Sequence, residues 1–387
     1  MSVEFSEAEL ALRERARRFG EERIEPNAME YVESGEWPWE LYERAGDAGL
    51  AGVALAEAYG GRDASLVETC IVAEEFCRAD SSVGIALVGA DIGTTVVSEF
   101  GTEAQKERWL PPVAAGEATT AIGLTEPDTG SALAEVSTTA RKEGTEYVIE
   151  GEKTWIANGR SADWTVTLCR TDPDAEDHTG LSMLVVPTDA EGYRAEPRDK
   201  LGLDAAEHTH VTYDGVRVPE DHLLGDEGEG FYQTLAWLEH GRIGIAAAHL
   251  GIAEGAFDRA LAYSREREQG GQPVGDYQGM RWKLADMRTK CRVARSQVYH
   301  AARLVDAHER GEPVEENLVE QASIAKLYAT EICVEVAEQA VQVFGGEGYA
   351  RENEVEHFYR DAKVGTIYEG TSEIQRNTIG KVLFDEL

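Results

Sequence analysis

One carboxylate near the C-terminus stands in a setting that suits proton transfer. Glu369 lies in the segment IYEGTSEIQR, among Ile, Tyr and Gly and just before a predicted helix start. An apolar pocket raises the pKa of a carboxyl group, whereas a nearby helix N-terminus lowers it. A general base matched to neutral pH needs such opposing effects, so Glu369 is a candidate base. Taken alone, such an acid more often lies at a surface or caps a helix, and Ser372 and Gln375 have the spacing of a capping box.

Three other segments offer groups that could hold a ligand. Residues 122–131 are rich in Thr, Ser and Gly, which expose backbone amides and hydroxyl groups. In residues 155–159, a Trp beside an Asn-Gly turn could be a flat platform for an aromatic cofactor. Residues 342–348 place three glycines at the end of a long helical pattern, where backbone can pass close to a partner. The alternatives are an ordinary interdomain loop, a core Trp that closes a hairpin, and a helix C-cap.

The first and last parts of the chain carry the patterns of helices that could position these segments. Ser6 and Glu9 have the capping-box spacing, which marks the first helix start. The alanines at 246–248 and Gly251 would let neighbouring helices approach closely. The apolar periodicity predicts helices over residues 7–24, 38–45, 66–79, 83–99, 103–114, 231–265, 277–309, 316–344 and 372–384.

The middle of the chain has the strand-and-hairpin signature of a small antiparallel β domain. No Gly-x-Gly-x-x-Gly motif follows a strand, so a Rossmann nucleotide site has no support. We therefore predict an α+β fold with an N-terminal α-helical domain (1–118), a middle antiparallel β domain (119–225) and a C-terminal α-helical domain (226–387). The predicted strands cover residues 147–149, 164–168, 181–186 and 210–213.

The composition argues against several classes of protein. The formal net charge of −36 disfavours nucleic-acid binding, which needs Lys and Arg patches. The dispersed cysteines predict reduced cytosolic thiols rather than a metal site or disulfide framework: they are Cys70, Cys77, Cys169, Cys291 and Cys333. Neither a run of about 18 apolar residues nor a basic, apolar leader appears, so we expect a cytoplasmic protein without a membrane span. The Asp and Glu residues are spread along the chain, and such a distribution suits a protein that stays soluble in concentrated salt, as a halophilic protein does.

The four segments, in this order inside an α–β–α chain, resemble the FAD-dependent acyl-CoA dehydrogenase family. TEPDTGS (125–131) resembles the family's TEPxxGS flavin loop, and WIANG (155–159) resembles its WITNG segment. QVFGGEGY (342–349) resembles its adenosine-diphosphate segment, and IYEGTSEIQR (367–376) its catalytic loop. The similarity runs over nearly the whole chain. It implies a C-terminal four-helix bundle, acyl-CoA dehydrogenase activity and FAD as the cofactor.

The resemblance also implies a role for each matching residue, and it implies no metal site. Glu369 matches the catalytic base, while Ser131, Glu239, Arg242 and Gly370 match substrate contacts, with Arg242 facing the CoA moiety. The residues that match contacts to the chain's own flavin are Ile122, Gly123, Leu124, Thr125, Ser131, Trp155, Ile156, Ala157, Thr371, Ser372 and Glu373. Those that match contacts to the FAD of a neighbouring subunit are Arg267, Tyr277, Gln278, Gln342, Val343, Phe344, Gly345 and Gly346. Such sharing between subunits implies a homotetramer.

The implied reaction is the 2,3-dehydrogenation of an acyl-CoA thioester. Glu369 would take the α-proton while the β-hydride passes to the flavin, which gives a trans-2-enoyl-CoA. Hydrogen bonds to the thioester carbonyl would come from the base's own amide and a flavin ribityl hydroxyl. The electrons would then pass to an electron-transfer flavoprotein, as in the β-oxidation of fatty acids.

Three positions depart from the family pattern. Ala132 stands where Asp is usual, Ala157 replaces a Thr whose hydroxyl commonly approaches flavin N5, and Gly270 stands where an aromatic often packs on the neighbour's flavin. Some branches carry the base on a helix just before the CoA-facing Arg, where this chain has Gly241. Two alternatives stay open, namely an acyl-CoA oxidase-like relative that uses oxygen and a non-catalytic flavin- or CoA-binding subunit.

Overall fold

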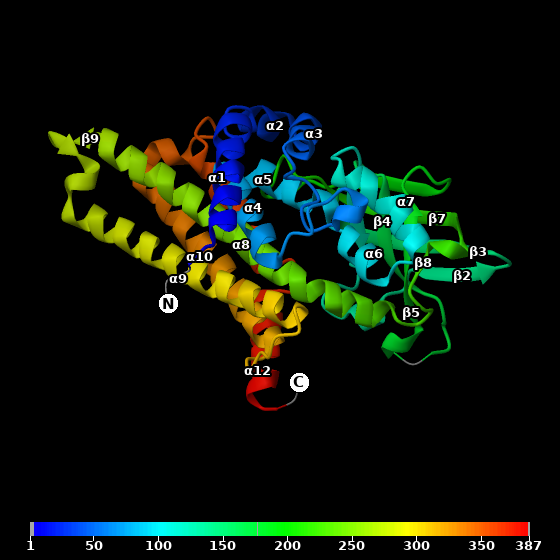
Figure 1. The fold of residues 1–387 in the computed structure, drawn as a ribbon. Coiled ribbons are helices and arrows are strands. Elements are labelled where there is room, and N and C mark those ends of the chain that lie inside the picture. The colour runs from blue at the N-terminus through cyan, green and yellow to red at the C-terminus, as the bar shows by residue number, and fades with distance from the viewer. Residues whose placement is uncertain (1–3, 176, 386–387) are drawn as a thin grey trace.

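A computed structural model describes residues 4–175 and 177–385, so the outer ends of the first and last predicted domains fall outside it. Helices come first, a sheet follows, and long helices end the chain (Figure 1). The Ser6 hydroxyl accepts from the Glu9 amide and the Glu9 carboxylate accepts from the Ser6 amide, so the predicted capping box is confirmed. The N-terminal helices are α1 (Glu7–Phe19), α2 (Ala28–Ser34), α3 (Trp39–Asp47), α4 (Leu66–Ala79), α5 (Ser81–Val88), α6 (Thr94–Phe100) and α7 (Glu103–Ala114).

One predicted N-terminal helix, over residues 83–99, is in fact two. The helix α5 ends at Val88, a 3₁₀ turn follows at Gly89–Asp91, and α6 begins at Thr94. By length and composition the stretch Ser81–Phe100 could cross a membrane, with a mean hydropathy of 1.4, but 56% of its apolar window is buried inside the fold. It is therefore packed as a core segment of the N-terminal helices.

The central sheet runs in the order β6-β7-β3-β2-β4-β5-β8, with β1 beside β4. Most neighbouring strands are antiparallel, as predicted, but β1 pairs with β4 in parallel from Thr120↔Trp164 to Gly123↔Thr167, and β2 meets β4 in parallel at Thr139↔Arg170. The predicted antiparallel β domain is confirmed for most of the described strand pairs, and the parallel pairings of β1 and β2 with β4 depart from it. The strand β1 comes directly from the helices and not from a hairpin. The strands are β1 (Thr120–Gly123), β2 (Thr139–Glu143), β3 (Glu146–Ala157), β4 (Trp164–Arg170), β5 (Leu181–Pro187), β6 (Tyr193–Pro197), β7 (His208–Pro219) and β8 (Leu223–Leu224).

The C-terminal helices pack around α10, which contacts α8, α9, α11 and α12. A Cβ added to Gly251 on α8 would collide with the Glu74 carbonyl on α4, so the close helix approach predicted from the small residues is confirmed. A short hairpin, β9 (Glu268–Gln269) and β10 (Gln272–Pro273), joins α8 to α9 at the far tip of the molecule (Figure 1). The helices are α8 (Gly230–Glu266), α9 (Gln278–Glu309), α10 (Leu318–Phe344), α11 (Val355–Ala362) and α12 (Ser372–Leu383).

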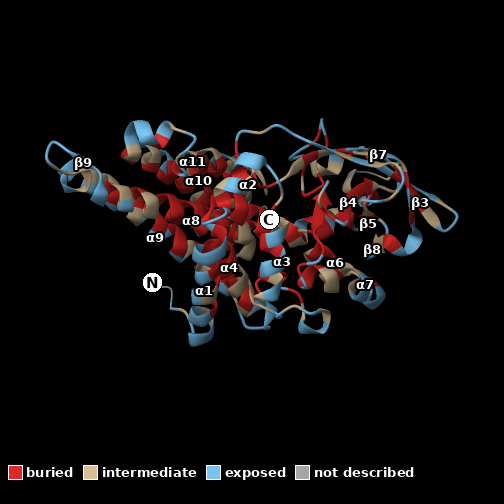
Figure 2. Cartoon of the chain, turned by 90° about the horizontal axis from the view of Figure 1, so that it is seen from above, coloured by how far each residue is buried: buried red, intermediate tan, exposed pale blue. Residues whose placement is uncertain are grey.

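The buried residues form one large helical core and two smaller cores around the sheet (Figure 2). The helical core joins α1, α4 and α5 to the C-terminal helices. The second core lies between α6, α7 and one face of the sheet, and Trp237 of α8 reaches it. Because α8 takes part in both, it links the helices to the sheet. The division at 118/119 and 225/226 stays a prediction.

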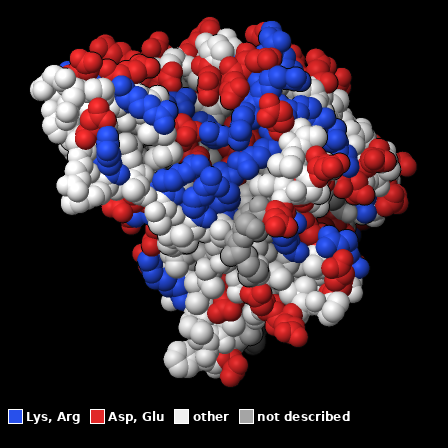
Figure 3. All heavy atoms as spheres, turned by 60° about the vertical axis from the view of Figure 1, so that its left-hand side comes forward, with Lys and Arg blue, Asp and Glu red and all other residues white. Residues whose placement is uncertain are grey.

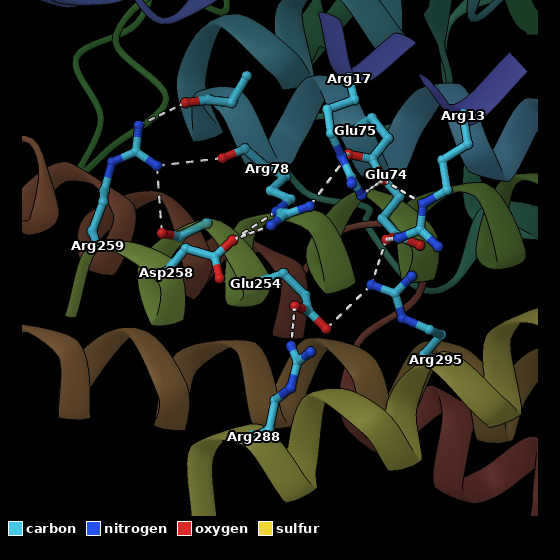
Figure 4. A network of polar contacts seen from close by, with 12 residues as sticks. Arg13, Arg17, Glu74, Glu75, Arg78, Glu254, Asp258, Arg259, Arg288 and Arg295 are labelled. Atoms are coloured by element: carbon cyan, nitrogen blue, oxygen red, sulfur yellow. Dashed lines mark hydrogen bonds and ion pairs between the residues drawn. The ribbon is translucent and has the colours of Figure 1, made fainter. Parts of the chain in front are cut away.

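A buried ionic network fastens α1, α4, α8 and α9 together (Figure 4). The fully buried Glu74 accepts from Arg13 at 2.9 Å and from the Tyr299 hydroxyl at 2.7 Å, and it pairs with Arg295 at 2.6 Å. Arg295 also reaches Glu254 at 3.1 Å. Buried charges are costly to leave unpaired, so these contacts compensate one another's desolvation.

Candidate active site

Glu369 lies in a turn between α11 and α12, and its carboxylate points at α8. The residue has a left-handed backbone, with a φ of 53°, and Gly370 follows with a φ of 84°. A Cβ built on Gly241 of α8 would lie 3.0 Å from Glu369 Oε2. This oxygen is shielded from solvent and has no hydrogen-bond partner among the described residues. The Glu369 carboxylate therefore lies against Gly241 of α8, the position that the family resemblance singled out in the sequence.

The electrostatic setting of Glu369 suits a base that works near neutral pH. Burial raises the pKa of this carboxyl group to about 7, although the positive charges of Lys326 and Arg242 oppose the rise. A base is most effective when its pKa lies near the working pH, because it is then largely ionised yet still basic. The opposing effects expected from the sequence are present, but the lowering comes from two cations rather than from a helix N-terminus.

The turn that carries Glu369 is held by side chains from α10 and α12. Lys326 Nζ donates to the Gly370 carbonyl at 2.6 Å, and Gln375 Nε2 donates to the same oxygen at 3.0 Å. The predicted capping box of Ser372 and Gln375 is wrong. Thr371 is the N-cap of α12, and its hydroxyl accepts from the Ile374 amide. The Gln375 side chain instead points back to the loop, where it donates to the Gly370 carbonyl.

Polar atoms without partners gather around this turn. Among the described residues, Glu369 Oε2, Arg242 Nε, Ser372 Oγ and Gln375 Oε1 are buried and have no hydrogen bond. The Glu369 amide likewise donates to no group in this part of the chain. Buried polar groups in folded proteins are nearly always paired, so such a gathering points to a polar ligand.

The predicted flavin loop lies next to the end of β3. The Thr154 amide donates to the Thr125 carbonyl at 2.8 Å, which brings residues 122–125 beside residues 155–157. Within the motif, Glu126 is a structural acid. Its carboxylate accepts from the buried Lys153 at 2.9 Å and from Ser137 and Thr138, and despite burial these partners lower its pKa to about 2.

Trp155 is a surface residue, so the alternative of a core tryptophan does not hold. It sits at a register shift between β3 and β7, with a φ of 59°, and it is 50% exposed. The Arg198 guanidinium lies over its ring at 4.4 Å from the centroid. A flat aromatic face thus stands at the edge of the flavin loop. Ser131 is exposed, and none of the described contacts joins it to Glu369.

A second group of predicted FAD residues lies far from the first. Arg267, Tyr277 and Gln278 are exposed at the tip that joins α8 to α9. Gly241 and Arg267 are 26 positions apart on α8, which corresponds to about 39 Å of helix. Residues 342–346 lie at the same end, since Phe344 stacks on Tyr263 of α8 at 4.2 Å. Gly345 forms the C-cap of α10, as the alternative interpretation expected.

Of the two predicted substrate residues on α8, Arg242 lies beside the base, and Glu239 lies near Arg242. Arg242 is only 8% exposed. Burial lowers its pKa, and the charges of Glu369 and Glu239 oppose this. The buried guanidinium is therefore directed into the site, where a negatively charged or carbonyl group could pair with it.

Three residues near the base were missed in the sequence. Lys326 is fully buried on α10. His249 is also fully buried, and burial lowers its pKa to about 4, so it is neutral at pH 7. The Tyr368 ring meets the His249 ring edge-on at 5.6 Å. A Lys in an otherwise apolar helical stretch was the only available signal, and it does not say what the side chain contacts.

Comparison with known proteins gives the family to which this helix–sheet–helix fold with its buried carboxylate belongs, a family of flavin-dependent oxidoreductases. Sequence models of the acyl-CoA dehydrogenase N-terminal, middle and C-terminal domains match residues 6–117, 121–216 and 228–384. An acyl-CoA dehydrogenase of Bacillus subtilis is 40% identical over 380 residues, which cover 98% of each chain. The chain belongs to the acyl-CoA dehydrogenase family, whose members are FAD-dependent enzymes that act on acyl-CoA.

Two solved structures show how far the similarity extends. A chain from the structure of the electron transferring flavoprotein of Acidaminococcus fermentans is 36% identical, with a TM-score of 0.94 and 99% of each chain covered. A glutaryl-CoA dehydrogenase from Mycobacterium smegmatis in complex with FADH2 is 30% identical, with a TM-score of 0.90, and 98% of this chain and 95% of that one are covered. The family resemblance inferred from the four motifs is therefore confirmed.

Proposed function

We propose that this enzyme converts an acyl-CoA thioester to the trans-2-enoyl-CoA, with Glu369 as the base that removes the α-proton. The observation that carries the proposal is the Glu369 carboxylate itself. Its Oε2 atom is shielded from solvent and lacks a hydrogen-bond partner among the described residues, the charge of Arg242 acts on it, and burial raises its pKa to about 7. A carboxylate in this state accepts a proton at neutral pH without competing water.

The same turn could supply the group that activates the α-proton. A thioester α-proton is weakly acidic, so the enzyme must stabilise the charge that develops on the carbonyl oxygen. The Glu369 amide has no acceptor among the described residues, so it would be available to donate to that oxygen. In other enzymes one such donor contributes about 2.7–4 kcal/mol. Arg242 is buried beside it and would hold the CoA end of the substrate.

The residues around the turn fit the family's FAD. The Ser372 hydroxyl, unpaired among the described residues, the backbone of residues 122–125, the exposed ring of Trp155 and the segment 155–157 offer polar and flat contacts to such a cofactor. FAD, when bound, supplies the acceptor for the hydride that leaves the β carbon. Ala157 cannot donate a hydrogen bond as a Thr would, and one such bond is worth about 0.5–1.5 kcal/mol.

We further propose a homotetramer, with residues 1–118, 119–225 and 226–387 as the domains of each subunit. Arg267, Tyr277 and Gln278 lie about 39 Å of helix from the turn of Glu369, so they serve a different cofactor copy than the one beside that base. Sedimentation should show a tetramer that retains FAD. A monomer that holds FAD with undiminished affinity would contradict this arrangement.

For the electron acceptor we propose an electron-transfer flavoprotein, within a cytoplasmic fatty acid β-oxidation. The chain similar to this one in the Acidaminococcus fermentans electron transferring flavoprotein structure supports this choice. Purified enzyme with acyl-CoA in air tests it. Rapid peroxide formation without another acceptor would favour the oxidase-like alternative.

The surface charge supports a halophilic setting. Asp and Glu are spread over the face in Figure 3, with Lys and Arg gathered between them. The formal net charge is −36, and salt screens the resulting repulsion.

Glu369→Gln tests the base, because glutamine keeps the size of the side chain but does not accept the proton. We expect flavin absorbance to bleach on the order of a hundredfold to ten-thousandfold more slowly under anaerobic conditions with a panel of acyl-CoAs. Bleaching at the wild-type rate would refute the assignment, and it would favour a different base or the non-catalytic alternative.

A further inference from the structure

A buried lysine on α10 lies directly behind the proposed base. The Lys326 side chain is 0% exposed, and its Nζ donates to the Gly370 carbonyl at 2.6 Å. Within the described residues this is the one hydrogen bond that Nζ makes. Taking an ammonium group out of water is strongly unfavourable unless its partners compensate. One carbonyl oxygen compensates only in part, so the nearby charge of Glu369 is needed to account for a lysine here.

The carbonyl that Lys326 holds belongs to a strained turn. Glu369 has a φ of 53°, and a left-handed backbone is strained for a non-glycine residue, so it persists only where the surroundings hold it. Gln375 Nε2 donates to the carbonyls of Gly370 at 3.0 Å and of Glu369 at 3.1 Å. Two buried side chains, from α10 and α12, therefore hold the turn from different sides.

Lys326 also faces the carboxylate of the base. Burial raises the pKa of Glu369, and of the two cations that lower it Lys326 has the larger effect, ahead of Arg242. Burial lowers the pKa of Lys326 to about 8, against the opposing charge of Glu369. The other charged or titratable groups that face this pair are Arg242, its neighbour Glu239 and His249 on α8, Glu331 on α10, Tyr368 in the turn and Glu373 on α12.

We propose that Lys326 is a positioning residue of the reaction, which clamps the Glu369–Gly370 turn and keeps the Glu369 carboxylate charged. The inference rests on the proposed function, because Lys326 acts only through Glu369. It has two separable parts. The hydrogen bond to Gly370 fixes the place of the base, and the positive charge sets the pH range in which the base works.

Two substitutions separate these parts. Lys326→Gln keeps a donor for the Gly370 carbonyl but removes the charge, and Lys326→Met removes both. The acidic limb of the kcat/KM profile should move upward in both variants by about one pH unit, which corresponds to about a fivefold loss at pH 7. Lys326→Met should also have a lower plateau at high pH, because the turn is less well held. The control Lys363→Met removes an exposed lysine from the segment before the turn, and its profile should match that of the wild type.

A second measurement does not depend on turnover. Infrared difference spectroscopy follows the protonated carboxyl band of Glu369, which is identified by its loss in Glu369→Gln. The pH midpoint of this band should rise in both Lys326 variants and stay unchanged in Lys363→Met. If Lys326→Met does not fold, Lys326→Gln still tests the charge. The clamp is then tested with Gln375→Leu, which removes the other donor to the Gly370 carbonyl, through the kcat/KM plateau of that variant at high pH.

The outcomes distinguish this inference from the proposed function. A wild-type infrared midpoint and a wild-type pH profile in Lys326→Gln would overturn the role of the charge. A wild-type plateau in Lys326→Met, or in Gln375→Leu if that variant replaces it, would overturn the clamp. Wild-type turnover by Glu369→Gln would instead remove Glu369 as the base, whatever the Lys326 variants do.

Discussion

Replacing Gly241 by Ala tests where the base lies, because the new methyl group would touch it. A Cβ at position 241 would lie 3.0 Å from Glu369 Oε2 and 3.5 Å from its carboxyl carbon. Ordinary contact between such atoms is about 3.5 Å, so the carboxylate must move by roughly 0.3–0.5 Å. A misplacement of about 1 Å costs on the order of a hundredfold in rate, so this shift should cost roughly four- to tenfold.

Gly244→Ala is the matched control on the same helix. A Cβ at Gly244 meets nothing within 4 Å, and both changes exchange Gly for Ala inside α8. Each exchange should stabilise the helix by about 0.5–1 kcal/mol, although the contact at position 241 offsets part of this gain. The assay is the anaerobic rate at which flavin absorbance bleaches on addition of acyl-CoA, with urea denaturation as the check on stability. Equal rates for the two variants would refute the placement of the base against Gly241.

Three further predictions follow from the charges. The pKa of Glu369 is about 7 and a base must be deprotonated, so kcat/KM should rise with pH. About one tenth of the enzyme should be active at pH 6 and about nine tenths at pH 8. An inflection of the profile near pH 4.5 would contradict the argument that burial raises this pKa. Arg295→Met leaves Glu74 and Glu254 without a shared partner, so the free energy of unfolding measured in urea should fall by about 3–5 kcal/mol. The control Arg292→Met changes an exposed residue and should cost less than about 0.5 kcal/mol. Similar losses in the two variants would mean that the ionic network is not buried as described. Raising NaCl from 0.1 to 1 M shortens the Debye length from about 10 to 3 Å, so Tm should increase for a chain of net charge −36, and a Tm independent of salt would argue against the halophilic interpretation.

Most helices could be predicted from the sequence because their signals are local. The predicted ranges 66–79 and 103–114 coincide with α4 and α7, and Ser6 caps α1 as expected. Amphipathic periodicity and capping depend on residues within one or two turns, so the chain itself contains that information. The predicted helix 83–99 failed where a 3₁₀ turn divides an apolar run that has no single amphipathic face.

The candidate site was predicted in part. The motifs indicated Glu369 and Arg242, and the structure brings both to one place. They did not indicate Lys326, which is 43 positions from Glu369 in the sequence and reaches the turn only because α10 packs beneath α12. They also assigned the cap of α12 to Ser372, whereas Thr371 forms it. Positions that match a family motif do not reveal which of their neighbours supply hydrogen bonds.

By itself, then, the sequence determined the order of helices and strands, the family and the identity of the proposed base, because these depend on local patterns and on motifs that can be read along the chain. Only the tertiary structure decided the parallel pairing of β1 with β4, the structural role of Glu126 and the position of Lys326 behind Gly370. Each of these depends on burial and on contacts between segments far apart in the chain. The pKa of Glu369 was also decided only by the tertiary structure. Desolvation by the surrounding residues raises it, and two cations that are far away in the sequence but near in space, Lys326 and Arg242, oppose that rise.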